Sequence, residues 1–179
     1  VAGHARAREV SGAKVFVMTG DEKVIAGGGK GQYLYTDSRW RPCPVDKVLK
    51  DGEKVTLGGT TLVARHTPGH TPGCTTWTAK VTDGKGKKLV VVVGSPNVNP
   101  GYQLVKNKAY PKIAKDFART FKVLNSLKCD YFLGAHGNYY GMHAKYPKLK
   151  GAKVSPFIDP AGYRDYISLK EKAFRDTLA

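Results

Sequence analysis

The sequence predicts an α+β fold in which helices pack on layered sheets, an arrangement described as α+β or αββα layering. Short β-type runs occur in pairs around glycine-rich turns, and helical patterns of apolar residues stand before and after them. The chain has 179 residues, of which 41% are hydrophobic, enough to bury one core. We therefore expect a single domain over residues 1–179.

The first part of the chain predicts short elements followed by a loop. Residues 2–10 carry Ala, Arg and Glu at helical spacing, and residues 14–18 form a short apolar run typical of a strand. Asp21 is expected to cap a short helix that ends at the glycines at positions 27–29. The stretch from there to about Val45 contains tyrosines and prolines without periodicity, which indicates an ordered loop.

The middle of the chain predicts two hairpins, because β-type runs flank residues that favour tight turns. The pairs are 54–57 with 60–64 through Gly58-Gly59, and 74–82 with 89–93 through 83–86.

A helix, a strand and a final helix are expected after the hairpins. Pro111 can open the first helix, and its apolar residues recur on one face: Ile113, Phe117, Phe121 and Leu124. The strand is expected over 130–133, and the last helix over 161–178. Residues 145–153 are rich in lysine and indicate a loop.

Thirty Lys and Arg against 14 Asp and Glu give a net charge of +16. Such a charge favours contact with nucleic acid or an anionic surface. No Cys/His finger and no aromatic strand signature of RNA-binding domains accompanies it, so nucleic acid is not the expected partner. The longest apolar run, 89–93, is far too short to span a membrane, and no membrane association is expected.

Three cysteines, Cys43, Cys74 and Cys129, do not indicate a disulfide framework or a zinc knuckle, because no two lie at the spacing of such a motif. Cys74 and Cys129 stand at the edges of apolar strands, where we expect small buried side chains.

Two of the five histidines stand at predicted strand ends, where layered folds place ligands. His70 lies in a turn rich in proline and glycine, and His136 follows the strand at 130–133. His66 and His70 are four residues apart, but Pro68 and Gly69 exclude a helix that would place both on one face.

A long part of the sequence resembles metallo-β-lactamases of subclass B3. The resemblance begins in the run from Val45 to Thr60 and leads into Thr67-Pro68-Gly69-His70-Thr71-Pro72-Gly73-Cys74. It continues in the same order through Gly94-Ser95, Asn99-Pro100-Gly101-Tyr102-Gln103-Leu104 and Phe132-Leu133-Gly134-Ala135-His136-Gly137-Asn138-Tyr139. It covers effectively the whole chain.

The resemblance implies an αββα sandwich and a dinuclear zinc site. In that family a His-x-His-x-Asp-His motif and two further histidines hold the metals. His70 is similar to the ligand that completes the first zinc site and His136 to one that completes the second. Zinc takes neutral imidazole nitrogens, and water bound to it attacks the lactam carbonyl as hydroxide. His4, His66 and His143 match no ligand and are expected to be structural or surface residues.

The loop after the 89–93 strand separates members of the superfamily. Glyoxalase-like and lactonase-like members keep an aspartate there that bridges the metals, whereas subclass B3 enzymes have serine, and this chain has Ser95. By the same resemblance, Ser95 and Asn97 contact the carboxylate of the substrate. The alternative is that both residues only shape a tight turn.

The chain departs from the family in one respect: the His-x-His-x-Asp-His motif does not occur in it. In the family that motif precedes a helix that begins much like Val1-Ala2-Gly3-His4-Ala5. We therefore expect a carboxy-terminal portion of such an enzyme, inactive by itself, with zinc weakly held or absent and no catalytic side chain of its own. If amino-terminal strands are missing, the remaining sandwich can be rearranged. An exposed sheet could then pair with another copy of the chain, so a homo-oligomer is expected.

The leading hypothesis is that the complete enzyme hydrolyses β-lactams, in a periplasmic or secreted location implied by the family only. A second hypothesis is another hydrolase of this fold, acting on a lactone, thioester or phosphodiester, which the absent bridging aspartate disfavours. A third is a non-catalytic protein that self-associates or binds polyanions. The sequence does not predict which β-lactams are preferred.

Overall fold

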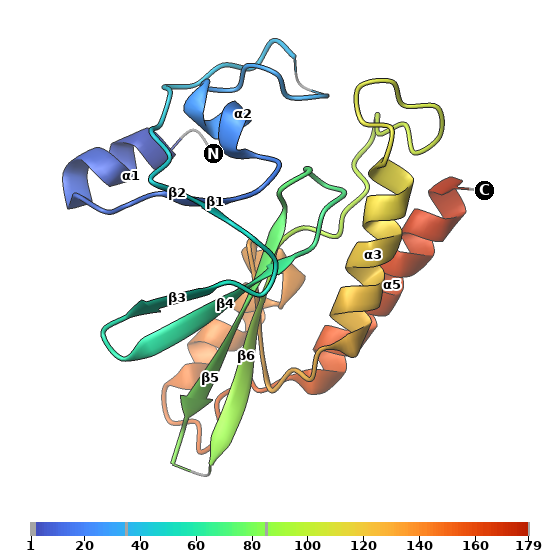
Figure 1. The fold of residues 1–179 in the computed structure, drawn as a ribbon. Helices are drawn as coiled ribbons and strands as arrows, with labels where there is room; N and C mark the ends of the chain where they lie inside the picture. Colours follow the sequence, from blue (N-terminus) through green and yellow to red (C-terminus); the bar gives the residue numbers. More distant parts are fainter. Residues whose placement is uncertain (1–2, 35, 85, 179) are drawn as a thin grey trace.

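The structure is a computed structural model that describes residues 3–34, 36–84 and 86–178. Ala2, at the start of the first predicted helix, and Lys85, in a predicted turn, lie outside the described residues. The elements follow one another in the order α1 (His4–Ser11), β1 (Phe16–Met18), α2 (Glu22–Ala26), β2 (Lys47–Leu49), β3 (Lys54–Leu57), β4 (Thr60–His66), β5 (Thr75–Thr82), β6 (Lys87–Val93), α3 (Ile113–Ser126), β7 (Tyr131–Gly134), α4 (Met142–Lys145) and α5 (Pro160–Leu178) (Figure 1).

Five strands form one sheet in the order β3-β4-β5-β6-β7. Neighbours are antiparallel except β6 and β7, which are parallel. The two hairpins are as predicted, and the first turns at Gly58 and Gly59 with φ of 55° and 78°, which glycine adopts without strain. Since β4, β6 and β7 run in the same direction, the loops that follow them meet at one edge of the sheet.

The main core lies between this sheet and the two long helices, α3 and α5. The four apolar residues predicted to share a face of α3 are all buried: Ile113, Phe117, Phe121 and Leu124. Phe174 of α5 packs on the rings of Phe117 and Phe121, with centroids 5.6 Å and 5.5 Å away. Figure 1 shows α3 and α5 side by side along one face of the sheet.

The other face of the large sheet packs against a second sheet, in which β1 and β2 run parallel. Met18 and Leu49 from the small sheet bury Ala64 of β4 together with the partly buried Trp77 of β5. Behind the small sheet, a third cluster joins Ala5 of α1, Ile25 of α2 and Cys43. The order of layers is therefore helix, sheet, sheet, helix, which confirms the predicted α+β class and its αββα layering.

Two local predictions were wrong, and one strand was not predicted. Lys47–Leu49 forms β2, not predicted from this short run, because it pairs with Phe16–Met18. The Asp21 carboxylate does not cap α2 but bonds a loop of the other sheet. Residues 145–149, expected to be loop, end α4 and continue as a 3₁₀ turn (Tyr146–Leu149). Within the described ranges no helix has both the length and the apolar character needed to span a membrane.

Candidate metal and substrate site

The loops after β4, β6 and β7 bring together the four residues singled out in the sequence. The β4–β5 loop carries His70, the loop after β6 carries Ser95 and Asn97, and the loop after β7 carries His136. Hydrogen bonds link His70 to Asn97 and Asn97 to Ser95, and His136 is connected to Asn97 through the ring of Tyr139. The four residues, up to 66 positions apart in the sequence, thus occupy one edge of the large sheet.

The imidazole of His70 has a defined tautomer. Its Nδ1 lies 3.1 Å from the carbonyl oxygen of Asn97. A carbonyl can only accept, so Nδ1 carries the hydrogen and Nε2 keeps a free lone pair. The hydroxyls of Tyr33 and Tyr102 both donate to the main-chain carbonyl of His70, each at 2.9 Å. The backbone and the ring of His70 are therefore both held by hydrogen bonds, as is usual for histidines that bind a metal.

The charge state of His70 also suits a metal ligand. Burial lowers the pKa of His70 below its ordinary value of 6.5, and the positive charge of His136 lowers it further, while the hydrogen bond to Asn97 and the charge of Asp21 act in the opposite direction. Neutral imidazole is therefore favoured, and that is the form that binds zinc.

Packing against α3 fixes the backbone beside His70. Gly69 has a φ of 131°, and a Cβ at this position would lie 2.7 Å from the Phe117 ring. The neighbouring carbonyl of Pro68 accepts a hydrogen bond of 2.6 Å from the hydroxyl of Thr120. Only glycine fits between the loop and the aromatic core at position 69.

Tyr139 connects the predicted substrate-binding pair to His136. The Nδ2 of Asn97 donates to the Tyr139 hydroxyl at 2.7 Å and to the Ser95 hydroxyl at 3.3 Å, and the Tyr139 hydroxyl donates to Ser95 at 3.3 Å. The ring of Tyr139 stands edge-on to His136, with centroids 5.1 Å apart. Sequence reasoning missed Tyr139, although it lies only three residues after His136.

The side chain of Cys74 contacts the backbone of Ser95. The Sγ of Cys74 accepts from the Ser95 N–H at 3.2 Å and lies 3.6 Å from the Ser95 carbonyl. Burial raises the pKa of Cys74 to about 11, so the side chain is a neutral thiol and not a nucleophile. As a residue Cys74 is half-buried, so the expectation of a small buried side chain is met only in part here. Cys129 is buried.

The remaining histidines take no part in this cluster. The Nε2 of His66 lies 2.7 Å from the carbonyl of Pro72, so this side chain braces the turn that carries His70. His4 and His143 are exposed on α1 and α4. Among the residues that the structure describes, no group of three or more His, Cys, Asp or Glu side chains is placed to hold a metal ion.

A cavity of about 290 Å³ opens beside His70. Its walls come from α2, from the loop at 31–34 and from the His70 loop, and they are mostly apolar or aromatic, with Val24, Ile25, Trp40 and Tyr102 among them. An apolar cavity with a few convergent polar groups is the usual form of a small-molecule site.

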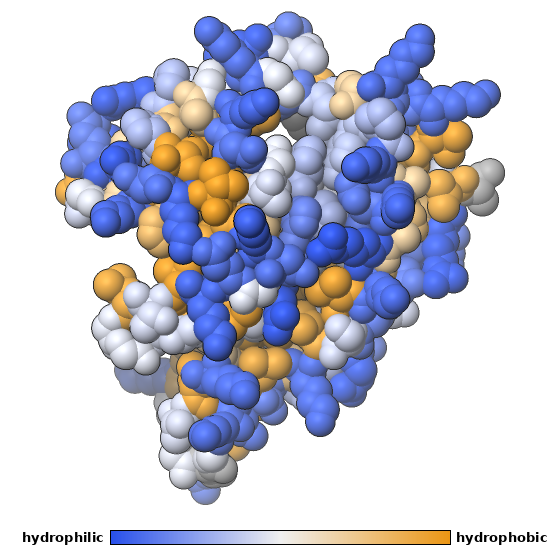
Figure 2. Space-filling model, in the orientation of Figure 1, coloured by the Kyte–Doolittle hydropathy of each residue, from blue (hydrophilic) through white to orange (hydrophobic). Residues whose placement is uncertain are grey.

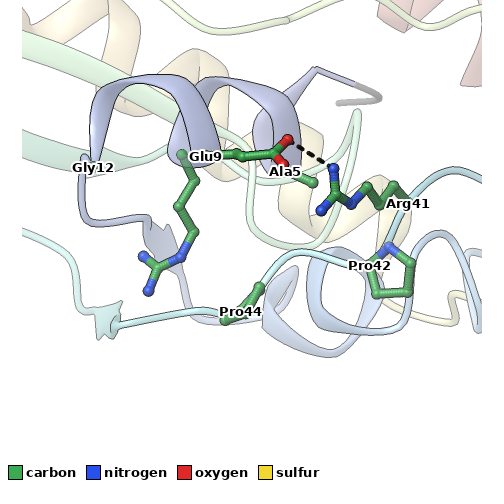
Figure 3. A pocket seen from close by; sticks show the side chains of 7 residues that line it. Ala5, Glu9, Gly12, Arg41, Pro42 and Pro44 are labelled. Carbon is green, nitrogen blue, oxygen red and sulfur yellow. Dashed lines mark hydrogen bonds and ion pairs between the residues drawn. The ribbon is translucent and has the colours of Figure 1, made fainter.

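A second cavity, of about 340 Å³, lies between α1 and the segment at 41–44 (Figure 3). Arg41 points across it to Glu9, with 2.8 Å between the charged groups, and Arg8 pairs with Asp46. Both arginines of this cavity are paired with carboxylates, so we place the candidate site at the sheet edge that carries His70.

Comparisons with solved structures identify the class of this fold. No family model matches the sequence. The FEZ-1 metallo-β-lactamase from Legionella gormanii is 45% identical, with a TM-score of 0.96 over 99% of this chain and 69% of that chain. BJP-1, a subclass B3 metallo-β-lactamase of Bradyrhizobium japonicum, is 34% identical, with a TM-score of 0.90 over 99% and 67% of the two chains. LRA-12, a class B3 di-zinc metallo-β-lactamase from an Alaskan soil metagenome, is 28% identical, with a TM-score of 0.89 over 98% and 67%.

The layering and the loops place the chain among the metallo-β-lactamase folds, which are hydrolases. The identities and coverage show that it belongs to the metallo-β-lactamases of subclass B3. At a TM-score of 0.96 the elements keep the arrangement that they have in FEZ-1, so the rearrangement considered from the sequence is not found.

The lowered pKa of His70 predicts a pH dependence. As the pH falls below 6.5, His70 takes up a proton more readily in the unfolded chain than in the folded chain, because its pKa is lowered only in the folded state. The contribution of His70 to the free energy of unfolding is therefore fully present above pH 6.5 and is lost as the pH falls below that value. An NMR titration of the imidazole signals should give a midpoint below 6.5 for His70. A midpoint at or above 6.5 would mean that the ring is solvated rather than held as described.

Proposed function

We propose that this chain contributes two zinc ligands, His70 and His136, and a substrate-binding pair, Ser95 and Asn97, to a zinc-dependent hydrolase of β-lactams. The observation that carries the proposal is the convergence of these residues at one sheet edge, with the His70 ring fixed by the carbonyl of Asn97. The likeness to subclass B3 enzymes across the whole chain supports the reaction class.

The residues present fit the donor set that zinc prefers. His70 offers Nε2 as a neutral imidazole, and zinc binds such nitrogens at about 2.0 to 2.1 Å. When bound, zinc lowers the pKa of a water molecule so that hydroxide is available near neutral pH. The Ser95 hydroxyl accepts from Asn97 and Tyr139, so its own hydrogen is available to the substrate carboxylate. The Asn97 amide would donate to the substrate by exchanging one of its two hydrogen bonds, to Tyr139 or to Ser95.

By themselves, we propose, these 179 residues do not hydrolyse β-lactams at an appreciable rate and hold zinc weakly. A catalytic zinc takes three protein ligands and keeps an open position, and the cluster described here offers two imidazoles. The remaining ligands of the proposed site would come from a segment with the His-x-His-x-Asp-His motif, which these residues do not contain. The family resemblance further implies a periplasmic or secreted location.

Supplying that motif should restore activity. A segment ending in His-x-His-x-Asp-His, fused before Val1 or co-expressed, is expected to give β-lactam hydrolysis that a chelator abolishes and zinc restores. Replacing His70 or His136 with Ala should lower kcat/KM by at least about tenfold, the scale at which even outer-shell changes act. The exposed His143→Ala variant serves as the matched control and should retain the rate.

A panel of substrates tests the reaction class in the same protein. Turnover of a lactone, a thioester or a phosphodiester without any turnover of β-lactams would contradict the subclass assignment and favour the alternative hydrolase. Equal losses in the His70 and His143 variants would contradict the assigned ligand.

Self-association through the small sheet is a further part of the proposal. Among the described residues β1 and β2 pair only with each other, so each has an open edge that can pair with another chain. Val48 of β2 is 44% exposed, and Figure 2 shows hydrophobic residues at the surface in the region of these strands. The occupant that fits this edge is a second copy of the chain, which presents the same open strands.

Light scattering on a fresh chromatographic peak measures this association. We expect a mass above the 19.5 kDa of one chain, and a shift toward the monomer for Val48→Lys, since a charge on an edge strand opposes pairing. Leu57→Lys, at an 85% exposed position of the β3–β4 hairpin, should leave the mass unchanged. A stable 19.5 kDa monomer that binds no hydrophobic dye would contradict self-association.

A further inference from the structure

Asp21 is a carboxylate that the proposed function does not use. It lies three residues after the end of β1 (Phe16–Met18), a strand of the small sheet, and borders the cavity beside His70. Although it occupies the N-cap position of α2, its side chain makes no capping hydrogen bond with that helix. Its two oxygens face the other sheet instead.

Both oxygens of Asp21 bind the loop that carries His70. The hydroxyl of Thr71 donates to Oδ2 at 2.5 Å, and the N–H of Gly73 donates to Oδ1 at 2.9 Å. These donors lie on either side of Pro72, whose carbonyl is held by the His66 ring. Figure 1 shows the start of α2 above this loop. The carboxylate therefore clamps the residues that directly follow His70.

The two segments also touch through their backbones. A Cβ added to Gly20 would lie 2.8 Å from the main-chain carbon of Pro72, and one added to Gly73 would lie 2.7 Å from the Asp21 carboxyl carbon. Real Cβ atoms do not approach so closely, so glycine is required on both sides of the contact. The separation between the β1–α2 turn and the His70 loop is thus set by backbone contact and by one side chain.

Burying the charged Asp21 carboxylate costs free energy, and its hydrogen bonds to the His70 loop explain why it is buried there. Loss of solvent raises the pKa of Asp21, and the hydrogen bonds from Thr71 and Gly73 offset that effect in part. A buried carboxylate is retained where its hydrogen bonds hold a specific arrangement. Here the arrangement held is the turn beside His70, because α2 receives no bond from this side chain.

We propose that Asp21 is a positioning residue: it holds residues 71–73 so that the His70 ring stays on the carbonyl of Asn97 with Nε2 unprotonated. The proposal rests on the proposed function only for the role of Nε2 as a zinc ligand. The positioning itself is a property of the metal-free chain.

Nitrogen-15 NMR of the imidazole groups tests the positioning in the metal-free chain at pH 8. The wild-type chain should show His70 as a single Nδ1–H tautomer. Asp21→Ala should replace that signal by a mixture of tautomers, whereas Asp21→Asn should retain it, because an amide can accept from Gly73 and donate to Thr71. An unchanged His70 signal in Asp21→Ala would overturn the proposal.

Asp46→Ala is the matched control. Asp46 also accepts a main-chain N–H, from Val15 at 2.7 Å, and pairs with Arg8, but its bonds stay on the α1 side of the small sheet. It should lower stability and leave the His70 tautomer intact. A change as large as that of Asp21→Ala would show general loosening and overturn the proposal.

Thr71→Val keeps the proposal testable if Asp21→Ala does not fold. It removes one of the two donors to Asp21. The second tautomer of His70 should then become detectable, at a smaller population than in Asp21→Ala. An unaltered single tautomer in Thr71→Val, with Asp21→Ala unfolded, would overturn the proposal. These NMR experiments contain no zinc, so they test the positioning alone. If a separate zinc titration showed no binding, that result would contradict the proposed function and leave the positioning by Asp21 untouched.

Discussion

The hydrogen bond from His70 Nδ1 to the carbonyl of Asn97 is the interaction on which the proposed site depends. It joins the loop after β4 to the loop after β6, and it decides which ring nitrogen is free. Two features make it possible. The strands β4 and β6 run in the same direction, so their loops meet, and Gly69 lets the backbone approach Phe117 closely enough to fix the turn. A change in either feature would displace the His70 imidazole from the carbonyl of Asn97, even though both hydrogen-bonding groups were still present.

Burial keeps some groups of the site neutral, and hydrogen bonds hold others in place. Burial favours the neutral forms of His70, the proposed zinc ligand, and of Cys74, an inert thiol bonded to Ser95. His136 is exposed, and its neighbour Tyr139 orders the Ser95 hydroxyl and the Asn97 amide, which are proposed to bind the substrate. His70, Asn97, Ser95 and Tyr139 therefore belong to one hydrogen-bonded network, so that a change at Tyr139 would affect both the proposed ligand and the proposed substrate-binding residues.

Much of the fold follows from local pattern. The spacing of Ile113, Phe117, Phe121 and Leu124 predicted the buried face of α3, and Gly58-Gly59 predicted the first hairpin, because helix periodicity and tight turns are encoded over a few residues. β2 could not be predicted, since three residues form a strand there only through pairing with β1. The cap expected from Asp21 failed for a similar reason: its partners are about fifty residues away in sequence.

The candidate site was only partly accessible from residue pattern. Position at strand ends pointed to His70 and His136, but Ser95 and Asn97 came from family resemblance alone. Tyr139 stood in the family-like run around His136, but nothing in the sequence indicated its role, which arises from contacts with Ser95 and Asn97, more than forty residues earlier. Networks of this kind depend on which loops meet, and a single sequence without its fold does not specify that.

A zinc-edge anomalous scattering map of crystals of the complemented protein tests the central claim most directly, because it locates the metal without reference to activity. The account predicts zinc at about 2.0 to 2.1 Å from Nε2 of His70, with a ring nitrogen of His136 at the same range from zinc. Zinc bound at His66, at His143 or at a cysteine, with His70 still bonded only to Asn97, would contradict it.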